Sequence, residues 1–239
     1  MHNIVKLLKD NPYPGRGIVL GCSGDGGSSV AVYFIMGRSV NSRNRVFEKT
    51  ADGIRTRAHD PTLLTDPSLV IYHPVRLLDG RAIVTNGDQT DTIHEHLRGG
   101  KGFHDALLTR EFEPDGPIYT PRISGLVEQN GRYSLSILKT EQGDPNCCRR
   151  NFFEYSAPVP GLGHFISVYK TDGDPPPSFE GEPIPVGIDV SGGLEPFAQS
   201  VWEALNGGNK VSLYASRTDL ATGQVSDLII NKYTQKVTV

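Results

Sequence analysis

The stretch LVIYHPVRLLDGRAIVTNG, residues 69–87, decides the class of fold. Two runs rich in Val, Ile and Leu, at 69–76 and 81–85, flank Asp79-Gly80. An Asp-Gly pair between apolar runs is typical of a tight hairpin turn in which the backbone adopts positive φ angles. The pattern therefore predicts a β-hairpin, and with it an antiparallel pair of strands.

Similar β-type runs lie on both sides of this hairpin. Short strands are expected at 17–22, 29–36 and 44–49 before it, and at 119–127, 132–140, 151–157, 163–170, 210–217 and 225–233 after it. Helices are expected at 2–9, 89–98, 103–110 and 191–208. Parallel βαβ units would alternate strand and helix more regularly, so we expect mostly antiparallel sheets covered by helices, an α+β fold.

A Pro-rich stretch at 173–185, GDPPPSFEGEPIP, interrupts the later strands. It is too short for a domain linker and reads as an excursion from one domain. We therefore expect residues 1–239 to form a single domain.

Composition narrows the classes of function. The chain has 239 residues, 37% of them hydrophobic and 21% charged, with a formal net charge of -3. This balance argues against nucleic acid as the main partner, because duplex-binding proteins usually carry a basic face. No apolar run approaches the roughly 20 residues of a membrane span, and the N-terminal segment lacks a signal-peptide pattern. Three cysteines are too few for a disulfide framework, so we expect a cytoplasmic protein with no membrane partner.

The block GRSVNSRNRVF at 37–47 carries three arginines directly after an apolar strand. Arg38, Arg43 and Arg45 can converge on a phosphate, because guanidinium groups donate planar, bidentate hydrogen bonds. A solvated hairpin corner is the alternative interpretation.

Three further segments could contribute to a site. In VTNGDQTD (84–91), a strand runs into Asn86-Gly87 and a helix begins near Asp88, so the junction either binds a ligand or simply turns and caps the chain. Arg122 enters an apolar strand and needs an anionic partner if buried, either a ligand phosphate or a carboxylate such as Glu128. Tyr72 either donates a hydrogen bond in a site or belongs to the core edge. The histidines and cysteines show no metal-binding spacing, so we expect no metal.

Four blocks together resemble the archaeal-type IMP (inosine monophosphate) cyclohydrolases and their bacterial relatives. They are YPGRGIVLG (13–21), YFIMGRSVNSRNRVF (33–47), AIVTNGDQTD (82–91) and YTPRISG (119–125), and they occur in the family's order. The resemblance implies a four-layer αββα sandwich like that of the N-terminal-nucleophile hydrolases. It also implies dehydrative ring closure of 5-formamidoimidazole-4-carboxamide ribonucleotide to IMP, without metal or organic cofactor, in a homo-oligomer.

The resemblance also suggests roles for residues. Arg38 and Arg45 align with two arginines of the family's block and would bind the anionic substrate, with Arg43 less firmly aligned and Arg122 near the phosphate or ring carbonyl. Tyr72 and Asn86 would contact the formamide or carboxamide, with Tyr72 as a proton donor. Asp88 would orient Asn86 or accept a proton.

Two other functions stay open at this point. One is an N-terminal-nucleophile amidohydrolase, in which cleavage before Cys22 frees a nucleophilic thiol and its α-amino group. The other is a non-catalytic purine-nucleotide-binding protein with the same fold.

Overall fold

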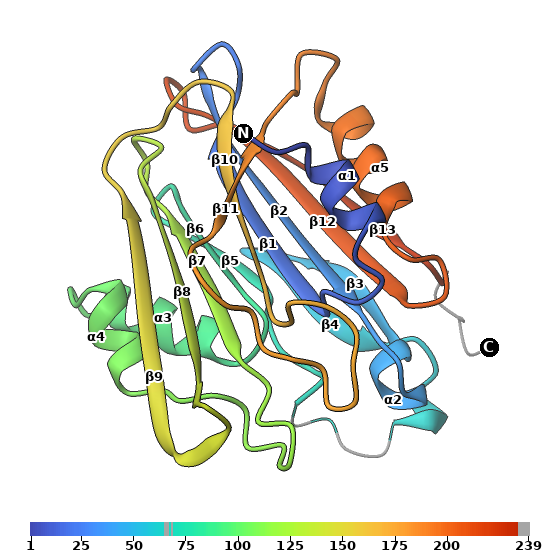
Figure 1. Cartoon of the computed structure of the whole chain (residues 1–239). Helices are drawn as coiled ribbons and strands as arrows, with labels where there is room; N and C mark the ends of the chain where they lie inside the picture. The colour runs from blue at the N-terminus through green and yellow to red at the C-terminus, as the bar shows by residue number, and fades with distance from the viewer. Residues whose placement is uncertain (65–66, 68, 234–239) are drawn as a thin grey trace.

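Two antiparallel sheets make up most of the computed structural model, which describes residues 1–64, 67 and 69–233 (Figure 1). The first sheet has six strands in the order β11-β10-β1-β2-β12-β13. These strands are β1 (Arg16–Cys22), β2 (Ser28–Met36), β10 (Leu162–Ser167), β11 (Ile184–Gly187), β12 (Lys210–Asp219) and β13 (Val225–Asn231). The predicted α+β class with antiparallel sheets is confirmed.

The second sheet has seven strands in sequence order, β3 to β9. They are β3 (Arg45–Thr50), β4 (Gly53–Ala58), β5 (Val75–Leu78), β6 (Arg81–Thr85), β7 (Arg122–Val127), β8 (Tyr133–Glu141) and β9 (Asp144–Tyr155). The predicted hairpin is present as β5 and β6, with Leu78 paired to Arg81. Its turn has the expected positive φ angles, 48° at Asp79 and 71° at Gly80.

The predicted strand at 69–76 is wrong in its first part, since β5 begins only at Val75. Pro74 has no backbone N–H for a strand ladder. The chain before it is instead held by Thr56 of β4, a strand that the sequence analysis did not identify. The Thr56 hydroxyl donates to the Val70 carbonyl at 2.7 Å and accepts from the Tyr72 N–H at 2.8 Å.

Helices lie on the outer faces of both sheets (Figure 1). On the six-stranded sheet, helix α5 (Leu194–Ala204) lies on β12 and β13 and packs against α1 (Ile4–Lys9). On the seven-stranded sheet, helix α3 (Gln89–Arg98) lies on β5 and β6 and packs against α4 (Phe103–Leu108). Two short turns of helix, α2 (Val40–Arg43) and η1 (Pro61–Leu63), lie between strands. In the part of the chain that the structure describes, no helix is long and apolar enough to cross a bilayer.

The facing sides of the two sheets enclose one apolar layer. Its members include Ile18 of β1, Val84 of β6 and Ile137 of β8, which belong to a single buried cluster. Gly125 of β7 permits the close approach, because a Cβ there would lie 2.7 Å from the Leu20 side chain of the opposite sheet. The sheets are therefore packed face to face in the middle of the layer.

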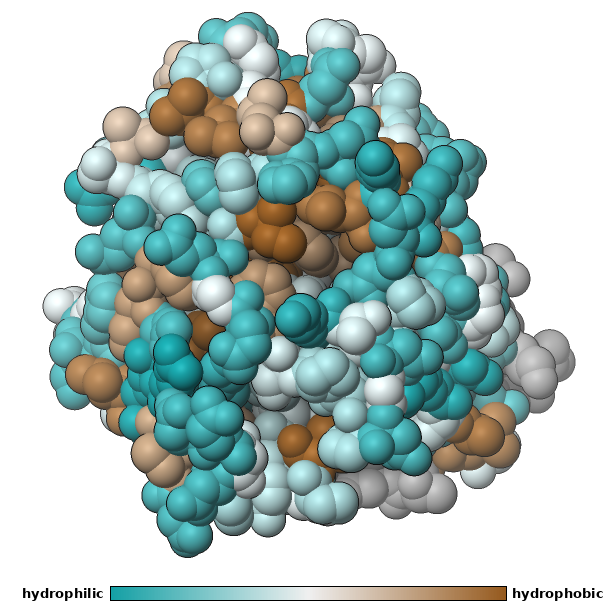
Figure 2. Space-filling view, viewed as in Figure 1, coloured by the Kyte–Doolittle hydropathy of each residue, from teal (hydrophilic) through white to brown (hydrophobic). Residues whose placement is uncertain are grey.

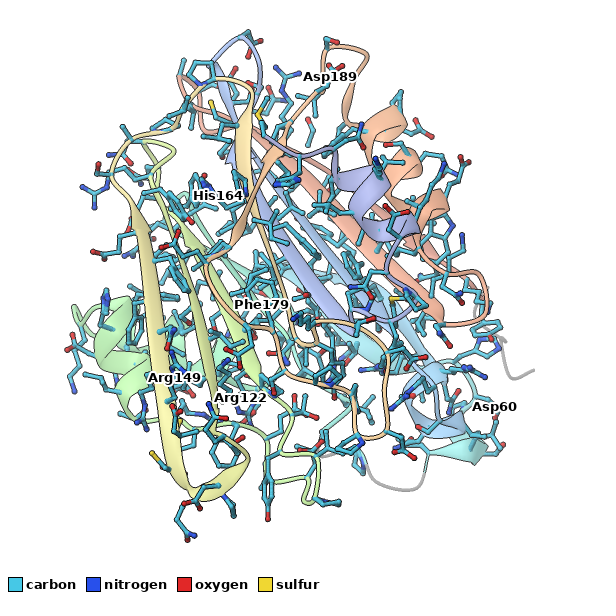
Figure 3. All side chains as sticks on the ribbon, in the orientation of Figure 1. Asp60, Arg122, Arg149, His164, Phe179 and Asp189 are labelled. Atoms are coloured by element: carbon cyan, nitrogen blue, oxygen red, sulfur yellow. The ribbon has the colours of Figure 1, made fainter. Side chains whose placement is uncertain are left out.

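A loop at 171–183, which we call the strap, crosses the open side of this layer (Figure 1). Phe179 of the strap is buried in the shared cluster and points between the sheets (Figure 3). Lys139 of β8 donates to the Phe179 carbonyl at 2.7 Å and to Glu180 at 2.6 Å. Above the strap, apolar surface shows between the two sheets on an otherwise mostly hydrophilic face (Figure 2).

Candidate active site

Buried polar side chains gather at one end of the layer between the sheets. Arg16 begins β1, Tyr33 lies in β2 and Arg45 begins β3. The Tyr33 ring stacks on Phe47 of the opposite sheet with centroids 5.8 Å apart, which places it between the sheets. Tyr72 and Glu113 complete the group, which we call the arginine end. Arg45 is only 1% exposed, although it carries a charge.

Arginine N–H groups at this end lack acceptors. Arg45 donates from Nε to the Ser42 carbonyl at 2.8 Å and from Nη2 to the Met36 carbonyl at 3.5 Å, whereas its Nη1 has no partner among the described residues. Arg16 Nε is likewise buried and unpartnered within them. Burial lowers the pKa of Arg45, and the nearby charge of Arg16 acts in the same direction. A buried donor without an acceptor costs about 1–3 kcal/mol, so this arrangement is ready for an anionic or carbonyl ligand.

Glu113 is the carboxyl group at the arginine end. It is 2% exposed, and one oxygen lies 3.7 Å from Arg16 Nη2 while the other accepts from Asn86 Nδ2 at 3.4 Å. Burial raises the pKa of Glu113, against the opposing charges of Arg16 and Arg122. A carboxyl group with a raised pKa is better suited than an ordinary glutamate to accept a proton and return it.

Two phenols meet beside these groups. The hydroxyls of Tyr33 and Tyr72 lie 2.8 Å apart, and burial raises the pKa of Tyr33. In such a pair one hydroxyl donates to the other, so the second keeps its own proton free to donate elsewhere. The arginine end thus combines unpartnered cationic donors, a carboxyl and a hydroxyl donor.

Asn86 lies next to Glu113, but the protein already uses both ends of its amide. Its Nδ2 donates to the Pro121 carbonyl at 2.9 Å, and its Oδ1 accepts from the Ile123 N–H at 2.8 Å and from Gln89 Nε2 at 3.0 Å. Gln89, rather than Asp88, therefore orients Asn86.

A carboxylate oxygen of Asp88 lies 2.7 Å from Arg122 Nη1, so Asp88 is an anionic partner of Arg122 within the protein. The sequence had left open a ligand phosphate or a carboxylate such as Glu128. The same Arg122 nitrogen donates to Gln89 at 2.7 Å, and Asp88 also accepts from Arg110. Burial alone would raise the pKa of Asp88, but the charges of Arg122 and Arg110 outweigh it and lower the pKa. Asp88 therefore stays ionised and is a poor proton acceptor. Arg122 Nε remains buried with no partner in the described chain.

The three arginines of 37–47 do not converge. Helix α2, which has a capping box of Ser39 and Ser42, begins after Arg38 and ends at Arg43, and the three side chains reach different partners. Arg38 donates to Asp172 and to the Gly173 carbonyl of the strap at 2.8 and 2.7 Å. Arg43 donates to the Gly37 carbonyl at 2.9 Å and to Asn209 at 3.1 Å. Only Arg45 reaches the arginine end.

Cys22 lies at the opposite end of β1. It is fully buried, and burial raises the pKa of its thiol. Cleavage before Cys22 would remove β1, which pairs with both β2 and β10 in the six-stranded sheet. The fold thus argues against a chain that begins at Cys22.

Comparison with known proteins identifies the family. The model of a family described as IMP cyclohydrolase-like protein matches residues 13–223. The chain belongs to this family. The matched range contains every residue of the arginine end.

Curated archaeal relatives agree with this membership. The chain is 30% identical over 160 residues to an IMP cyclohydrolase of Methanopyrus kandleri, covering 66% of this chain and 75% of that protein. It is 30% identical over 163 residues to one of Methanosphaera stadtmanae, covering 66% and 74%. A third, of Methanothrix thermoacetophila, is 35% identical over 122 residues, covering 48% and 57%.

Sequence reasoning missed three residues of the arginine end, namely Arg16, Tyr33 and Glu113. Arg16 and Tyr33 lie inside the quoted blocks 13–21 and 33–47 but were not singled out. Arg16 enters an apolar strand, the same signal that marked Arg122, so it could have been found. Glu113 lies in the loop EFEPDG (111–116), where no local pattern predicts burial.

Proposed function

We propose that this chain is an IMP cyclohydrolase, which closes 5-formamidoimidazole-4-carboxamide ribonucleotide to IMP with release of water. The observation that carries the proposal is the arginine end, where unpartnered, buried arginine donors lie beside a carboxyl with a raised pKa. Family membership and the named activity of the curated relatives support the same reaction.

The reaction sets three requirements. The carboxamide nitrogen attacks the formyl carbon, so both groups must be held face to face. Negative charge develops on the formyl oxygen and needs preorganised donors. Protons must leave the two nitrogens that become part of the new ring, and the formyl oxygen must leave as water.

The groups of the arginine end match these requirements. Arg45 Nη1 and Arg16 Nε donate to the formyl oxygen as its charge develops. In the first step the C–N bond forms, the Glu113 carboxylate accepts the proton of the attacking nitrogen, and a Tyr33–Tyr72 hydroxyl protonates the formyl oxygen.

The second step reverses both proton transfers. Glu113 returns its proton to the new hydroxyl group, which leaves as water, and the tyrosine pair takes back a proton from the formamide nitrogen as the C=N bond forms. Both groups then regain their starting states, so the cycle needs no other proton donor or acceptor.

Of the remaining predicted residues, Asn86 and Arg122 lie beside this centre, whereas Arg38 and Arg43 bond to other parts of the chain. Asn86 acts by positioning Glu113, since its own amide is fully bonded. Asp88 fixes Arg122 and Arg110. Substrate binding by Arg38, Arg43 and Arg122 stays a prediction, and the unpartnered Nε makes Arg122 the best placed of the three. The absence of a metal or cofactor requirement also stays a prediction.

The architecture proposed with this function is the four-layer αββα sandwich of N-terminal-nucleophile hydrolases, in one domain over residues 1–239. Helices on the outer faces of both sheets support it, as does the apolar cluster that the sheets share. We also propose a homo-oligomer in the cytoplasm that binds no nucleic acid.

An absorbance assay for ring closure of the formamido ribotide tests the function. We expect a rate above that of the spontaneous reaction, unchanged by EDTA. No such rate, with IMP still bound in a thermal-shift experiment, would favour a non-catalytic nucleotide-binding protein. An intact mass that begins at Cys22 would favour the amidohydrolase.

A further inference from the structure

The two sheets have four outer edges, and three of them contact other parts of the chain. The N-terminal segment pairs with β11, where His2 N–H donates to the Pro185 carbonyl at 2.8 Å and the Gly187 N–H donates to His2 at 3.0 Å. The far edges, β3 and β13, meet through the Asn231 amide, which accepts from the Phe47 N–H at 2.8 Å and donates to the Phe47 carbonyl at 3.0 Å. Each of these three edges therefore has a hydrogen-bonded contact with another part of the chain.

The fourth edge is β9, a strand of 12 residues. It pairs with β8 on one side, and no strand of the described chain pairs with its other side. A long edge strand presents a row of unpaired N–H and C=O groups, to which another strand can add. Proteins often protect such an edge with like charges, but β9 carries Asp144 and Glu154 as well as Arg149 and Arg150. Its charges therefore do not repel a second copy of the same strand.

Alternation fixes which side chains could meet across such a pair. On the outer face, the ring centroids of Phe152 and His104 of α4 lie 4.3 Å apart. On the inner face, the Tyr155 ring stacks on Tyr133 with centroids 4.6 Å apart. A two-fold axis perpendicular to the sheet makes the two copies of β9 antiparallel and keeps each face on its own side. Two residues that lie opposite each other across the axis must then both have even numbers or both have odd numbers.

Centring this axis on Phe152 gives opposite charges on the outer face. Phe152 faces its own copy, and Arg150 faces Glu154 of the second copy, twice by symmetry. Within its own chain Arg150 donates to the Arg110 carbonyl from Nε at 3.2 Å and from Nη2 at 2.8 Å, and to the Cys148 carbonyl from Nη1 at 3.5 Å. Its Nη2 also lies 3.8 Å from Glu111, and its side chain is 25% exposed, so a Glu154 carboxylate of the second copy would be an additional partner. The Glu154 side chain is 66% exposed, and its Oε1 lies 3.9 Å from His104 Nε2. This register also leaves Pro145, which cannot donate to a ladder, outside the paired stretch 149–155.

We propose that a second copy of this chain pairs with β9 in this antiparallel register, so that two seven-stranded sheets join into one across a two-fold axis. The partner is argued from the open edge and from the complementarity of Arg150 with Glu154. The proposal concerns assembly and does not depend on the reaction that the chain catalyses.

Sedimentation equilibrium with charge-reversed variants tests the interface. We expect the wild type to have twice the chain mass of 26.1 kDa, and Glu154→Arg or Arg150→Glu to raise the dimer Kd at least about tenfold, since each sets like charges opposite one another. The double variant should restore the dimer. Asp144→Arg, on the same strand but outside the paired stretch, is the control and should remain dimeric. A monomeric wild type, or single variants that dimerise like the wild type, would overturn the proposal.

Disulfide cross-linking tests the register, in a background in which Cys147 and Cys148 are replaced by Ser. Residues directly opposite across antiparallel strands have Cβ atoms about 4.5–5.5 Å apart, close to the spacing of a disulfide. Phe152→Cys should therefore cross-link two chains on mild oxidation. Phe153→Cys, which would face Asn151, should cross-link far less. Equal cross-linking of both, or none at residue 152, would contradict the register.

Discussion

The two ends of the layer between the sheets both hold buried polar groups, but they satisfy them differently. At the arginine end, Arg45 Nη1 and Arg16 Nε have no acceptor within the described residues. The opposite end, which we call the histidine end, contains Cys22, Tyr133, Tyr155 and His164. There the Tyr133 hydroxyl lies 2.7 Å from His164 Nδ1, and the Tyr155 ring stacks 3.9 Å from the His164 ring. Figure 3 shows His164 and Arg122 near opposite ends of the sheets.

This difference separates a ligand site from a structural contact. A histidine, a tyrosine and a cysteine are as capable of chemistry as an arginine and a glutamate. At the histidine end, the Tyr133 hydroxyl and His164 Nδ1 already satisfy each other, whereas the arginine end keeps buried donors without an acceptor in the described residues. The buried polar group without a partner is therefore the better guide to the substrate.

The largest effect is expected from Glu113→Gln, which keeps the shape of the side chain but removes its basic oxygen. We expect kcat for ring closure to fall about 1,000-fold, within the range found for general acid–base groups. The absorbance assay measures this loss. Glu128→Gln, at a half-buried carboxyl after β7, is the matched control and should retain the wild-type rate. A Glu113→Gln variant with wild-type kcat would remove the proton acceptor from the proposed mechanism.

The next largest effect is expected from Arg45→Met, which deletes the unpartnered donor and keeps much of the volume. Loss of one donor to a developing oxyanion typically lowers kcat about 100-fold or more. Arg55→Met, at an arginine 51% exposed on β4, serves as the control. If both variants lost activity equally, Arg45 would have no special part in the reaction.

The pH dependence tests Glu113 in the wild type. Because its pKa is raised, the carboxylate is lost as pH falls through a value above the ordinary 4.3 or so of glutamate. The value of kcat should therefore fall about tenfold per pH unit on the acid side of that pKa. A profile of kcat against pH measures this acid limb, which is the range of pH over which kcat falls. A limb that persists unchanged in Glu113→Gln would belong to another group.

At the histidine end, Tyr133→Phe should lower stability rather than activity. Removal of the bond to His164 is expected to reduce the free energy of unfolding by about 1 kcal/mol. Denaturant titration measures this change. Tyr72→Phe is the counterpart at the arginine end and should lower kcat by about tenfold. Loss of kcat in Tyr133→Phe alone would reverse the roles of the two ends.

The smallest effect is expected from Cys22→Ala. The thiol is fully buried and burial raises its pKa, so it is a poor nucleophile. Ring closure should continue at the wild-type rate in the absorbance assay. Abolished activity in a variant that still folds, as judged by circular dichroism, would reinstate a nucleophilic Cys22.

Local patterns predicted most of the strands but only part of the site. The β5–β6 hairpin and helix α3 at 89–98 follow from turn chemistry and apolar spacing, which act over a few residues. The separation of Arg45 from Arg38 and Arg43 depends on one turn of helix with a capping box, which the spacing of arginines does not reveal. Burial of Glu113 depends on packing against Arg16 and Asn86, which lie far from it in sequence.

A crystal structure of the chain with IMP would test the contrast between the two ends most directly. We predict that the purine ring lies at the arginine end, with an oxygen or nitrogen atom within hydrogen-bond distance of Arg45 Nη1 and Arg16 Nε. Nucleotide bound beside His164, with Arg45 Nη1 still lacking an acceptor, would contradict the account.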